Sequence, residues 1–482
     1  MAEGLRREAT AIARVDPRSA GEQRLGSRCE TPIYDLVGVG FGPSNLSLAI
    51  ALADHNAEVN ARGGRARGEI VTAHFLERQP QFGWHRGMLI DDATMQVSFL
   101  KDLVTLRNPA SRYSFLSYLH SKGRLIDFIN HKNLFPLRIE FHDYFEWCAA
   151  QVDDQVSYGY EVVAVRPVCE GDEVVCFDVV ARTGACSDEP MVLRARNLIM
   201  ATGLSPNLPA GIAAGDRVWH NSDLLHRIDS VDEDTARRFI VIGAGQSAAE
   251  TTAFLHERFR RAEVCSVFSR FGYSPSDDSP FANRIFDPSA VDEFYVAPES
   301  MQQKIMDYHA NTNYSVVDID LIDDLYRRTY REKVLGVARL RWFNASRPMA
   351  VVETDNAVQV TVESMTSGER TVLDADVVIC ATGYQPDDSL PLLGDLAGQC
   401  RRDERGGLRV ERDYRVVTDA EIRPGIYLQG GGTEHTHGIT SSLLSNNAIR
   451  SGEILESILQ RRLSTTGEPV WPAHAVSGSP TS

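Results

Sequence analysis

The chain of 482 residues is long enough for two or three domains with complete cores, and its 43% hydrophobic and 24% charged residues are typical of a globular protein. A formal net charge of −16 argues against binding to nucleic acids or to anionic membranes. The sequence has no run of about 18 apolar residues, the length that a membrane span needs. Residues 1–31 lack the apolar stretch of a secretion signal, so we expect a cytoplasmic protein with flexible or disordered tails at 1–31 and 463–482.

The cysteines and histidines give no sign of a metal or dithiol centre. None of the eight cysteines has C-x-x-C spacing, which argues against a zinc ribbon and favours idle thiols in a reducing cytosol. His85, His435 and His437 lack ligand spacing with carboxylates or thiols. We therefore expect no metal site.

The first chemical signal in chain order is a glycine-rich turn. The apolar run over residues 34–39 is typical of a buried parallel strand, and it leads into Gly38-Val-Gly40-Phe-Gly42-Pro43. We expect Gly38 to permit the tight turn and Gly40 to let the backbone approach a pyrophosphate at a helix N-terminus. Residues 71–77 predict the next strand, which ends in Glu77, an acid suited to ribose hydroxyls. This pattern indicates an FAD-like site.

The segments that follow predict helices and then a meander. Residues 56–68 are interpreted as a surface insertion, and residues 96–150 as helices with their connections. Apolar runs predict an antiparallel meander over 162–163, 177–180 and 191–193, and then a buried strand over 197–203. Pro206 and Pro209 mark a linker.

A second glycine turn follows about two hundred residues after the first. The apolar run before it leads into Gly243-Ala-Gly245-Gln-Ser-Ala248. The next strand, over 263–269, ends in Arg270 rather than in an acid, and an arginine there can bind the 2′-phosphate of NADPH. Two dinucleotides in one chain indicate hydride transfer from a nicotinamide to a flavin.

The rest of the chain completes two nucleotide-binding folds. Helices are predicted over 285–340, a hairpin over 358–372, strands over 376–384 and 426–430, and a last helix over 443–463. This order predicts an α/β protein of two Rossmann-like domains, with the NADPH domain inserted in the FAD domain and a small, mainly helical substrate region. The expected boundaries are 32–208 and 373–462 for the FAD domain and 209–372 for the NADPH domain, which includes the helical substrate region at 285–340.

Four motifs longer than the glycine turns carry a resemblance to a known family. They cover residues 35–45 (DLVGVGFGPSN), 95–103 (MQVSFLKDL), 311–318 (NTNYSVVD) and 437–445 (HGITSSLLS). The chain resembles the microbial N-hydroxylating flavin monooxygenases, which act on ornithine or lysine in siderophore and related pathways. The likeness extends from about Ile33 to Leu463. Cys380 departs from the pattern, since the family more often has Leu or Phe there.

The resemblance implies three groups of site residues. For FAD they are Gly38, Gly40, Gly42, Glu77, Arg78, Trp84, His85, Gln96, Val162, Ser442, Leu443 and Leu444, with Gln96 facing the flavin ring. For NADPH they are Gly243, Gly245, Gln246, Ser247, Ala248, Arg270, Asn313, Tyr314 and Ser315. For the amino acid they are Lys101, Asn283, Phe286, Asn313 and Ser445. The sequence itself supports a substrate-binding role for Lys101, because this residue is a lone cation in an otherwise apolar segment and could bind an α-carboxylate.

The function implied is the FAD- and NADPH-dependent N5-hydroxylation of L-ornithine by O₂ through a C4a-hydroperoxyflavin. The protein orients the reactants and excludes water, so we expect no side-chain nucleophile or base. The resemblance also implies a homotetramer, and it implies neither a nucleic-acid partner nor a membrane.

Three alternatives stay open at this point. An L-lysine N6-monooxygenase differs by one methylene of substrate, worth about 1–3 kcal/mol in a pocket; we favour ornithine because residues 95–147 look closest to that branch. A disulfide reductase needs a redox-active cysteine pair, which the sequence lacks. A flavin-binding sensor without turnover is disfavoured by the complete NADPH pattern.

Overall fold

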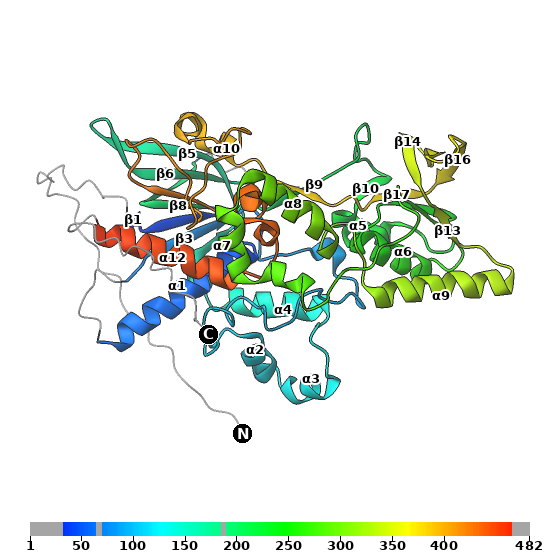
Figure 1. Cartoon of the computed structure of the whole chain (residues 1–482), viewed down its shortest axis with the longest axis horizontal. Helices are drawn as coiled ribbons and strands as arrows, with labels where there is room; N and C mark the ends of the chain where they lie inside the picture. Colours follow the sequence, from blue (N-terminus) through cyan, green and yellow to red (C-terminus); the bar gives the residue numbers. More distant parts are fainter. Residues whose placement is uncertain (1–31, 64–69, 185–188, 465–482) are drawn as a thin grey trace, which may run out of the picture. The chain divides into compact units, whose positions relative to one another are not determined.

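Two parallel sheets, each leading into a glycine-rich turn, form the framework of the computed structural model, which describes residues 32–63, 70–184 and 189–464 (Figure 1). The first sheet has the strand order β19-β8-β2-β3-β4, with every neighbouring pair parallel. Its strands are Gly425–Leu428 (β19), Asn197–Met200 (β8), Leu36–Val39 (β2), Ala73–Glu77 (β3) and Val156–Tyr158 (β4). The central strand β2 is buried along its whole length, as expected for a parallel sheet covered on both faces.

One face of this sheet is covered by helices. Helix α1 (Pro43–Ala61) lies beside α12 (Asn447–Ser464), and Pro43 occupies its first turn, where a missing N–H leaves no bond unmade. Helices α2 (Phe115–Ser121), α3 (Leu125–His131) and α4 (Arg138–Ala149) add a cluster of buried aromatic rings to this core. Residues 56–61 belong to α1, so they do not begin an insertion as expected; residues 64–69 lie outside the described part.

The other face is covered by a mixed sheet. Its strand order is β1-β7-β6-β5, from Ile33–Tyr34 (β1), Met191–Ala195 (β7), Glu173–Thr183 (β6) and Tyr160–Glu170 (β5). Strands β5, β6 and β7 pair antiparallel, which confirms the predicted meander, while β1 pairs parallel with β7. Buried side chains of β6, such as Phe177 and Val179, pack between the two sheets.

The second parallel sheet has the order β10-β17-β11-β12-β13. Its strands are Val218–His220 (β10), Val377–Cys380 (β17), Arg238–Ile242 (β11), Glu263–Val267 (β12) and Leu340–Phe343 (β13). We expected the strand over 376–384 to return to the first domain, and this was wrong: β17 pairs with β10 and β11. Its fully buried run Val377–Cys380 suits either sheet, so only the pairing decides.

Two short strands connect the halves. Leu204–Pro206 (β9) pairs antiparallel with Tyr384–Pro386 (β18), so the chain's outward and return crossings run side by side. The predicted hairpin is a three-stranded sheet of Ser346–Glu353 (β14), Val358–Ser364 (β15) and Arg370–Ala375 (β16). Together the two parallel sheets and the insertion confirm the predicted fold class.

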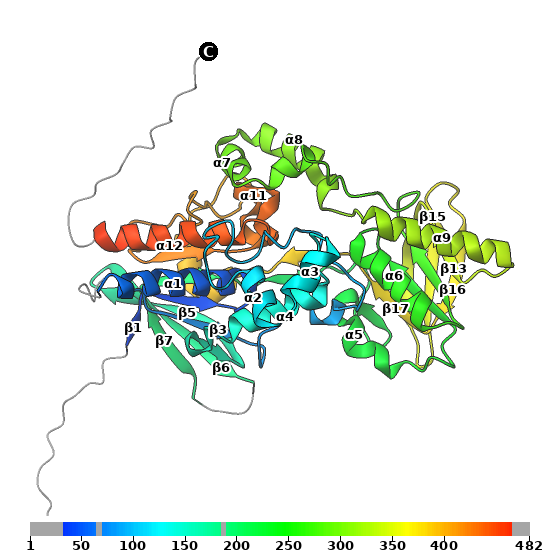
Figure 2. The ribbon, with the colours of Figure 1, turned by 90° about the horizontal axis from the view of Figure 1, so that it is seen from below.

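The helical segment over 285–340 divides between two neighbours, although we expected one substrate region. Helix α7 (Pro288–Val296) packs on α11 (Glu434–His437), whereas α9 (Ile319–Leu335) packs on α6 (Gln246–Arg258), as Figure 2 shows. Leu325 of α9 fills a small core with Ala249 of α6. Helix α8 (Glu299–His309) lies between α7 and α9 in the chain, with α5 (Leu224–Arg227) and α10 (Leu390–Leu393) as short helices elsewhere.

The 3₁₀ turns complete the element list. They are Arg86–Met88 (η1), Asp153–Gln155 (η2), Asn221–Asp223 (η3), Ile228–Ser230 (η4), Ala282–Phe286 (η5), Ala310–Thr312 (η6), Gly394–Gln399 (η7), Gly431–Thr433 (η8) and Ile439–Ser442 (η9). Among residues 32–63, 70–184 and 189–464, no helix combines the length and apolarity that crossing a bilayer requires. The predicted tail at 1–31 and residues 465–482 of the predicted tail at 463–482 lie outside the described residues, whereas residues 463 and 464 still belong to α12.

Candidate active site

The three glycines of the first turn have different tasks. A Cβ on Gly38, inside β2, would lie 2.2 Å from the Phe75 ring. Gly40 has φ +82°, and its Cβ would lie 2.4 Å from the carbonyl oxygen of Ala201. A Cβ on Gly42, the N-cap of α1, would meet no described atom within 4 Å. Open space beside the backbone therefore lies at Gly42, and Gly40 is required for close packing on Ala201, while the approach of a pyrophosphate at Gly40 stays a prediction.

A buried carboxylate fixes the turn from the next strand. Glu77 Oε2 accepts a hydrogen bond from the Phe41 N–H at 2.6 Å, and Oε1 accepts one from the Gln79 N–H at 2.8 Å. No described side chain caps α1, so its first N–H groups stay available to a ligand. This open, positive helix end beside an acid fits the pyrophosphate and ribose of FAD.

The remaining residues expected at FAD come from three places. His85 has φ +49°, a left-handed conformation that is uncommon for non-glycine residues, and its ring lies 5.6 Å from that of Tyr384. Trp84 packs edge-on against Phe145, with ring centroids 5.3 Å apart. Val162 is buried at a bulge in β5, whereas Arg78 is exposed.

Ser442, Leu443 and Leu444 lie in a turn and not on the last helix. We expected that helix to begin at residue 443, but α12 begins at Asn447. The buried Arg450 of α12 holds the turn, since its Nη1 donates to the Ser441 carbonyl at 2.7 Å. Ser445 is itself buried.

In the second glycine turn, as in the first, one glycine packs closely on a distant backbone carbonyl and another is the N-cap of a helix. Gly243 has φ +143°, and its Cβ would lie 2.2 Å from the carbonyl oxygen of Ala381. Gly245 is the N-cap of α6, and the first described neighbour of its Cβ would be the Ser315 Cα at 3.5 Å. Gln246, Ser247 and Ala248 form the first turn of α6. This helix end also fits a pyrophosphate.

Arg270 lies three residues beyond β12 and is exposed. Its Nη1 donates to the Ser315 carbonyl at 2.9 Å, and Ser315 has φ +57°. The neighbouring Tyr314 hydroxyl bonds the Glu434 carboxylate and lies beside Asn313 and Ser442. The 311–318 segment therefore touches both the NADPH turn and the C-terminal flavin segment.

Lys101 contacts Phe286, another of the expected substrate residues. Its Nζ is 5.5 Å from the centroid of the Phe286 ring. Burial lowers the pKa of Lys101, and the Asp287 carboxylate partly opposes this. Asn283 is on the same turn, η5, which packs against η9 just before Ser445. The structure thus brings a cation and a ring together, while the Asn283 amide on the same turn donates to the Asp278 carbonyl at 2.8 Å.

Asp102 explains why Lys101 is held there. Its Oδ1 accepts hydrogen bonds from the backbone N–H groups of Val104 at 3.0 Å and Thr105 at 2.6 Å. Its Oδ2 accepts one from the Phe115 N–H at 2.8 Å. A buried carboxylate with three backbone donors fixes the loop that carries Lys101.

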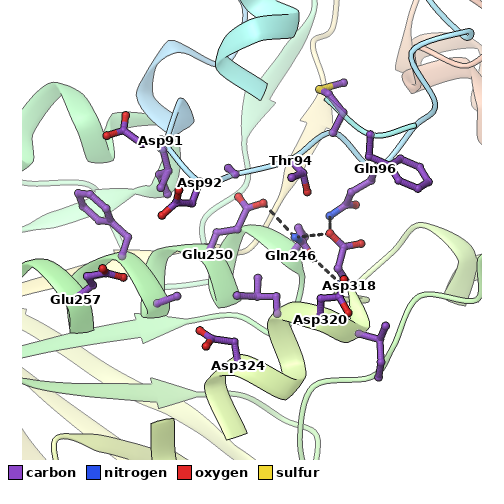
Figure 3. A pocket seen from close by; sticks show the side chains of 18 of the residues that line it. Asp91, Asp92, Thr94, Gln96, Gln246, Glu250, Glu257, Asp318, Asp320 and Asp324 are labelled. Atoms are coloured by element: carbon purple, nitrogen blue, oxygen red, sulfur yellow. Dashed lines mark hydrogen bonds between the residues drawn. The ribbon is translucent and has the colours of Figure 1, made fainter. Parts of the chain in front are cut away.

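A cavity of about 880 Å³ lies between residues 89–96 and the facing helices α6 and α9 (Figure 3). Gln96 Nε2 donates to Asp318 Oδ2 at 3.4 Å, and Gln246 Nε2 donates to the same oxygen at 3.0 Å. Many of the side chains that line the cavity are acidic, which disfavours the binding of phosphates there.

The contacts around this cavity join the two nucleotide-binding units, and we call this region the junction. The sequence did not indicate three of its residues, Arg138, Glu250 and Asp318. Asp318 closes a motif that we singled out, but nothing in the sequence marks its side chain. Arg138 and Glu250 lie 112 residues apart and form a buried, bidentate ion pair. Only the fold brings them together.

Cysteines and metal-ligating side chains form no centre in the described part. Its six cysteines, Cys148, Cys169, Cys176, Cys265, Cys380 and Cys400, are free. Within the same residues no group of three or more His, Cys, Asp or Glu side chains is placed to hold a metal ion.

His437 makes the fold sensitive to acid. Its ring stacks on that of Tyr414 with centroids 4.1 Å apart, and burial lowers its pKa from 6.5 to about 3; the hydrogen bond to the Arg412 carbonyl opposes this shift, and the Arg412 and Arg450 charges add to it. The unfolded chain therefore binds a proton below about pH 6.5 that the fold excludes, and the free energy of unfolding falls by up to about 1.4 kcal/mol per pH unit. Urea unfolding of His437→Gln should show a shallower loss of stability between pH 6.5 and 4; an unchanged slope would assign the effect elsewhere.

Comparison with known proteins completes the description of the site. The family model for L-lysine 6-monooxygenase/L-ornithine 5-monooxygenase matches residues 32–386. The L-ornithine N(5)-monooxygenase of Burkholderia cepacia is 39% identical over 452 residues, which are 91% of this chain and 97% of that protein. The ornithine N-hydroxylase of Kutzneria sp. 744, solved with reduced FAD, NADP⁺ and L-ornithine, superimposes with a TM-score of 0.84 at 47% identity, over 89% of this chain and 100% of its own. The L-lysine 6-monooxygenase of Pseudomonas syringae gives 0.76 at 31% identity, over 89% and 99%.

Proposed function

This chain belongs to the L-lysine 6-monooxygenase/L-ornithine 5-monooxygenase family, and we propose that it hydroxylates the side-chain amine of L-ornithine with FAD, NADPH and O₂. The balanced reaction is R–NH₂ + O₂ + NADPH + H⁺ → R–NHOH + H₂O + NADP⁺. The observation that carries the proposal is the contact of Lys101 with Phe286 of η5, the turn that packs against η9 three residues before Ser445. The greater identity with the Kutzneria ornithine enzyme than with the lysine enzyme supports ornithine.

FAD, when bound and reduced by NADPH, supplies the chemistry that activates O₂. The N-terminus of α1 at Gly42 would bind its pyrophosphate, and Glu77 would accept its ribose hydroxyls. The half-buried Leu443 and Leu444 would shield the flavin from water. Gln96 and His85 would face the flavin from the segment that follows β3.

The NADPH site would use the corresponding parts of the second domain. Gly245, Gln246 and Ser247 offer the backbone N–H groups that begin α6. The exposed Arg270 offers a guanidinium for the 2′-phosphate. Asn313 and Tyr314 would reach toward the nicotinamide half, because their segment also contacts Ser442 on the flavin side.

Arg270→Ala should raise the KM for NADPH roughly tenfold or more, since a charge-assisted hydrogen bond to a phosphate is lost. The KM for ornithine and the melting temperature should change little, because Arg270 is exposed. Arg260→Ala, another exposed arginine of the same domain, serves as the control. Steady-state kinetics with varied NADPH and with varied NADH test whether Arg270 binds the 2′-phosphate. An unchanged KM for NADPH would remove Arg270 from the site.

The substrate residues bind and orient, and we assign none of them as nucleophile or base. Lys101 would pair with the α-carboxylate, and Asn283 and Ser445 would take the α-ammonium. The reacting amine must be neutral, since a protonated amine has no lone pair. Binding the amino acid by its α-substituents leaves that amine in a region without an assigned fixed charge, with Asn313 as its neutral neighbour.

The deciding experiment compares L-ornithine, L-lysine, putrescine and cadaverine at matched concentrations, with assay of hydroxylated amine and of NADPH. We expect product from ornithine well above that from lysine. Lysine turnover equal to or above that of ornithine would reassign the substrate. Neither NADPH consumption nor hydroxylated amine from any of them would favour the flavin-binding sensor.

We also propose a cytoplasmic homotetramer, and a domain boundary that differs from our first expectation. Because β17 pairs in the second sheet, the NADPH domain would extend to β18, with the FAD domain resuming from residue 387. Size-exclusion chromatography with light scattering tests the assembly, and a monomeric or dimeric mass would contradict it.

A further inference from the structure

Asp318 occupies the N-cap of α9 without capping it. Aspartate is favoured at this position because its carboxylate usually accepts an N–H from the first helical turn. Here the side chain forms no such bond to the described helix. Its Oδ2 instead accepts from Gln246 Nε2 at 3.0 Å and from Gln96 Nε2 at 3.4 Å, and its backbone N–H donates to Gln246 Oε1 at 2.9 Å (Figure 3).

A second set of bonds runs parallel to the first. Arg138 of α4 donates to both carboxylate oxygens of Glu250 at 2.9 and 2.7 Å, and its Nη1 also donates to the Met88 carbonyl at 3.0 Å. Gln246 Nε2 donates to Glu250 Oε1 at 3.1 Å. Gln246 is therefore shared by the ion pair and by Asp318.

The two sets connect the two nucleotide-binding units at one point. Gln96 and α4 belong to the flavin side, whereas Gln246 and Glu250 lie in the first turns of α6, behind the proposed NADPH turn, and Met88 packs in the core of the second unit. The Arg138–Glu250 pair bonds directly across the junction. Asp318 adds the connection from the helix start to Gln96, the residue expected at the flavin ring.

We propose that Asp318 is a positioning residue that fixes Gln246 and Gln96 relative to one another, and so keeps the NADPH turn in register with the flavin side. This inference rests on the proposed function, because it assigns the two ends of the connection to NADPH and FAD. Without the connection, only a fraction of the molecules hold the binding-competent arrangement, and the apparent affinity for NADP⁺ falls by that fraction. Electrons then reach O₂ without hydroxylation: NADPH + H⁺ + O₂ → NADP⁺ + H₂O₂.

Three variants of the full-length holoenzyme test the proposal. Asp318→Ala removes the shared acceptor. Asp318→Asn keeps one acceptor oxygen for the bonds that Oδ2 accepts but removes its charge. Asp320→Ala makes the same change two residues further on, at an exposed position in the first turn of α9.

For Asp318→Ala we expect roughly tenfold weaker NADP⁺ binding, by analogy with other charge-assisted hydrogen bonds, and a larger share of H₂O₂ at saturating ornithine. The KM for ornithine should stay unchanged. Asp318→Asn, which keeps the acceptor but not its charge, should lose less NADP⁺ affinity than Asp318→Ala, and Asp320→Ala should behave as the wild type. Hydrogen exchange without nucleotide should rise in Asp318→Ala at residues 89–96 and 246–250 alone.

Wild-type NADP⁺ affinity and coupling in Asp318→Ala would overturn the proposal. So would a general rise in exchange shared with Asp320→Ala, because it would show loss of stability instead of positioning. Failure of the wild type to hydroxylate ornithine would refute the proposed function separately, since NADP⁺ titration and hydrogen exchange still decide the role of Asp318.

Discussion

Gly40→Ala should give a protein of low stability that does not retain FAD. The added Cβ would lie 2.4 Å from the Ala201 carbonyl oxygen, and alanine would have to adopt φ +82°. The left-handed conformation costs about 1–2 kcal/mol, and displacing the end of β8 adds about 1–3 kcal/mol. Thermal melting and the visible flavin absorbance of the purified variant measure both effects.

Gly42→Ala is the matched control two residues away. Its Cβ would meet no described atom within 4 Å, and its φ of −82° suits alanine. We expect less than about 1 kcal/mol of lost stability, the cost of a poorer N-cap, but weaker FAD binding if the cofactor approaches there. Normal stability and FAD content in Gly40→Ala would refute the close packing at Ala201. Normal FAD affinity in Gly42→Ala would move the ligand's approach away from Gly42.

The sequence predicts the nucleotide-binding framework because its signals are local. An apolar run, a glycine turn and a helix occur within about 25 residues at both β2–α1 and β11–α6, and each motif specifies its own geometry. The position of Glu77 at a strand end and of Arg270 just past one follows from the same pattern. The tasks of individual glycines do not, because Ala201 and Ala381 reach Gly40 and Gly243 from distant strands.

The junction between the two units could not be predicted, because its contacts are long-range. Arg138 and Glu250 are ordinary charged residues on two amphipathic helices until the fold pairs them. The sheet that receives β17 depends on its partners β10 and β11, since a four-residue buried run pairs equally well in either sheet. The helices over 285–340 were predicted by type, but their packing partners were not.

Lys101→Met should raise the KM for L-ornithine about a hundredfold, with a smaller effect on kcat. Methionine keeps the apolar stem against Phe286 and removes only the ammonium. A charge-assisted bond to a carboxylate is worth up to about 3 kcal/mol, and about 2.7 kcal/mol corresponds to a hundredfold. Steady-state kinetics with ornithine measures the change, and the melting temperature shows whether the loop fixed by Asp102 is intact.

Putrescine separates carboxylate binding from every other role of Lys101, because it is ornithine without the α-carboxylate. If Lys101 binds that group, the variant and the wild type should use putrescine with equal kcat/KM, although both use it poorly. The loss of kcat/KM caused by removing the ammonium and the loss caused by removing the carboxylate should then not add, because either change removes the same interaction. An equal hundredfold loss on both substrates would instead assign Lys101 to the architecture of the pocket, and the α-carboxylate would need another cation.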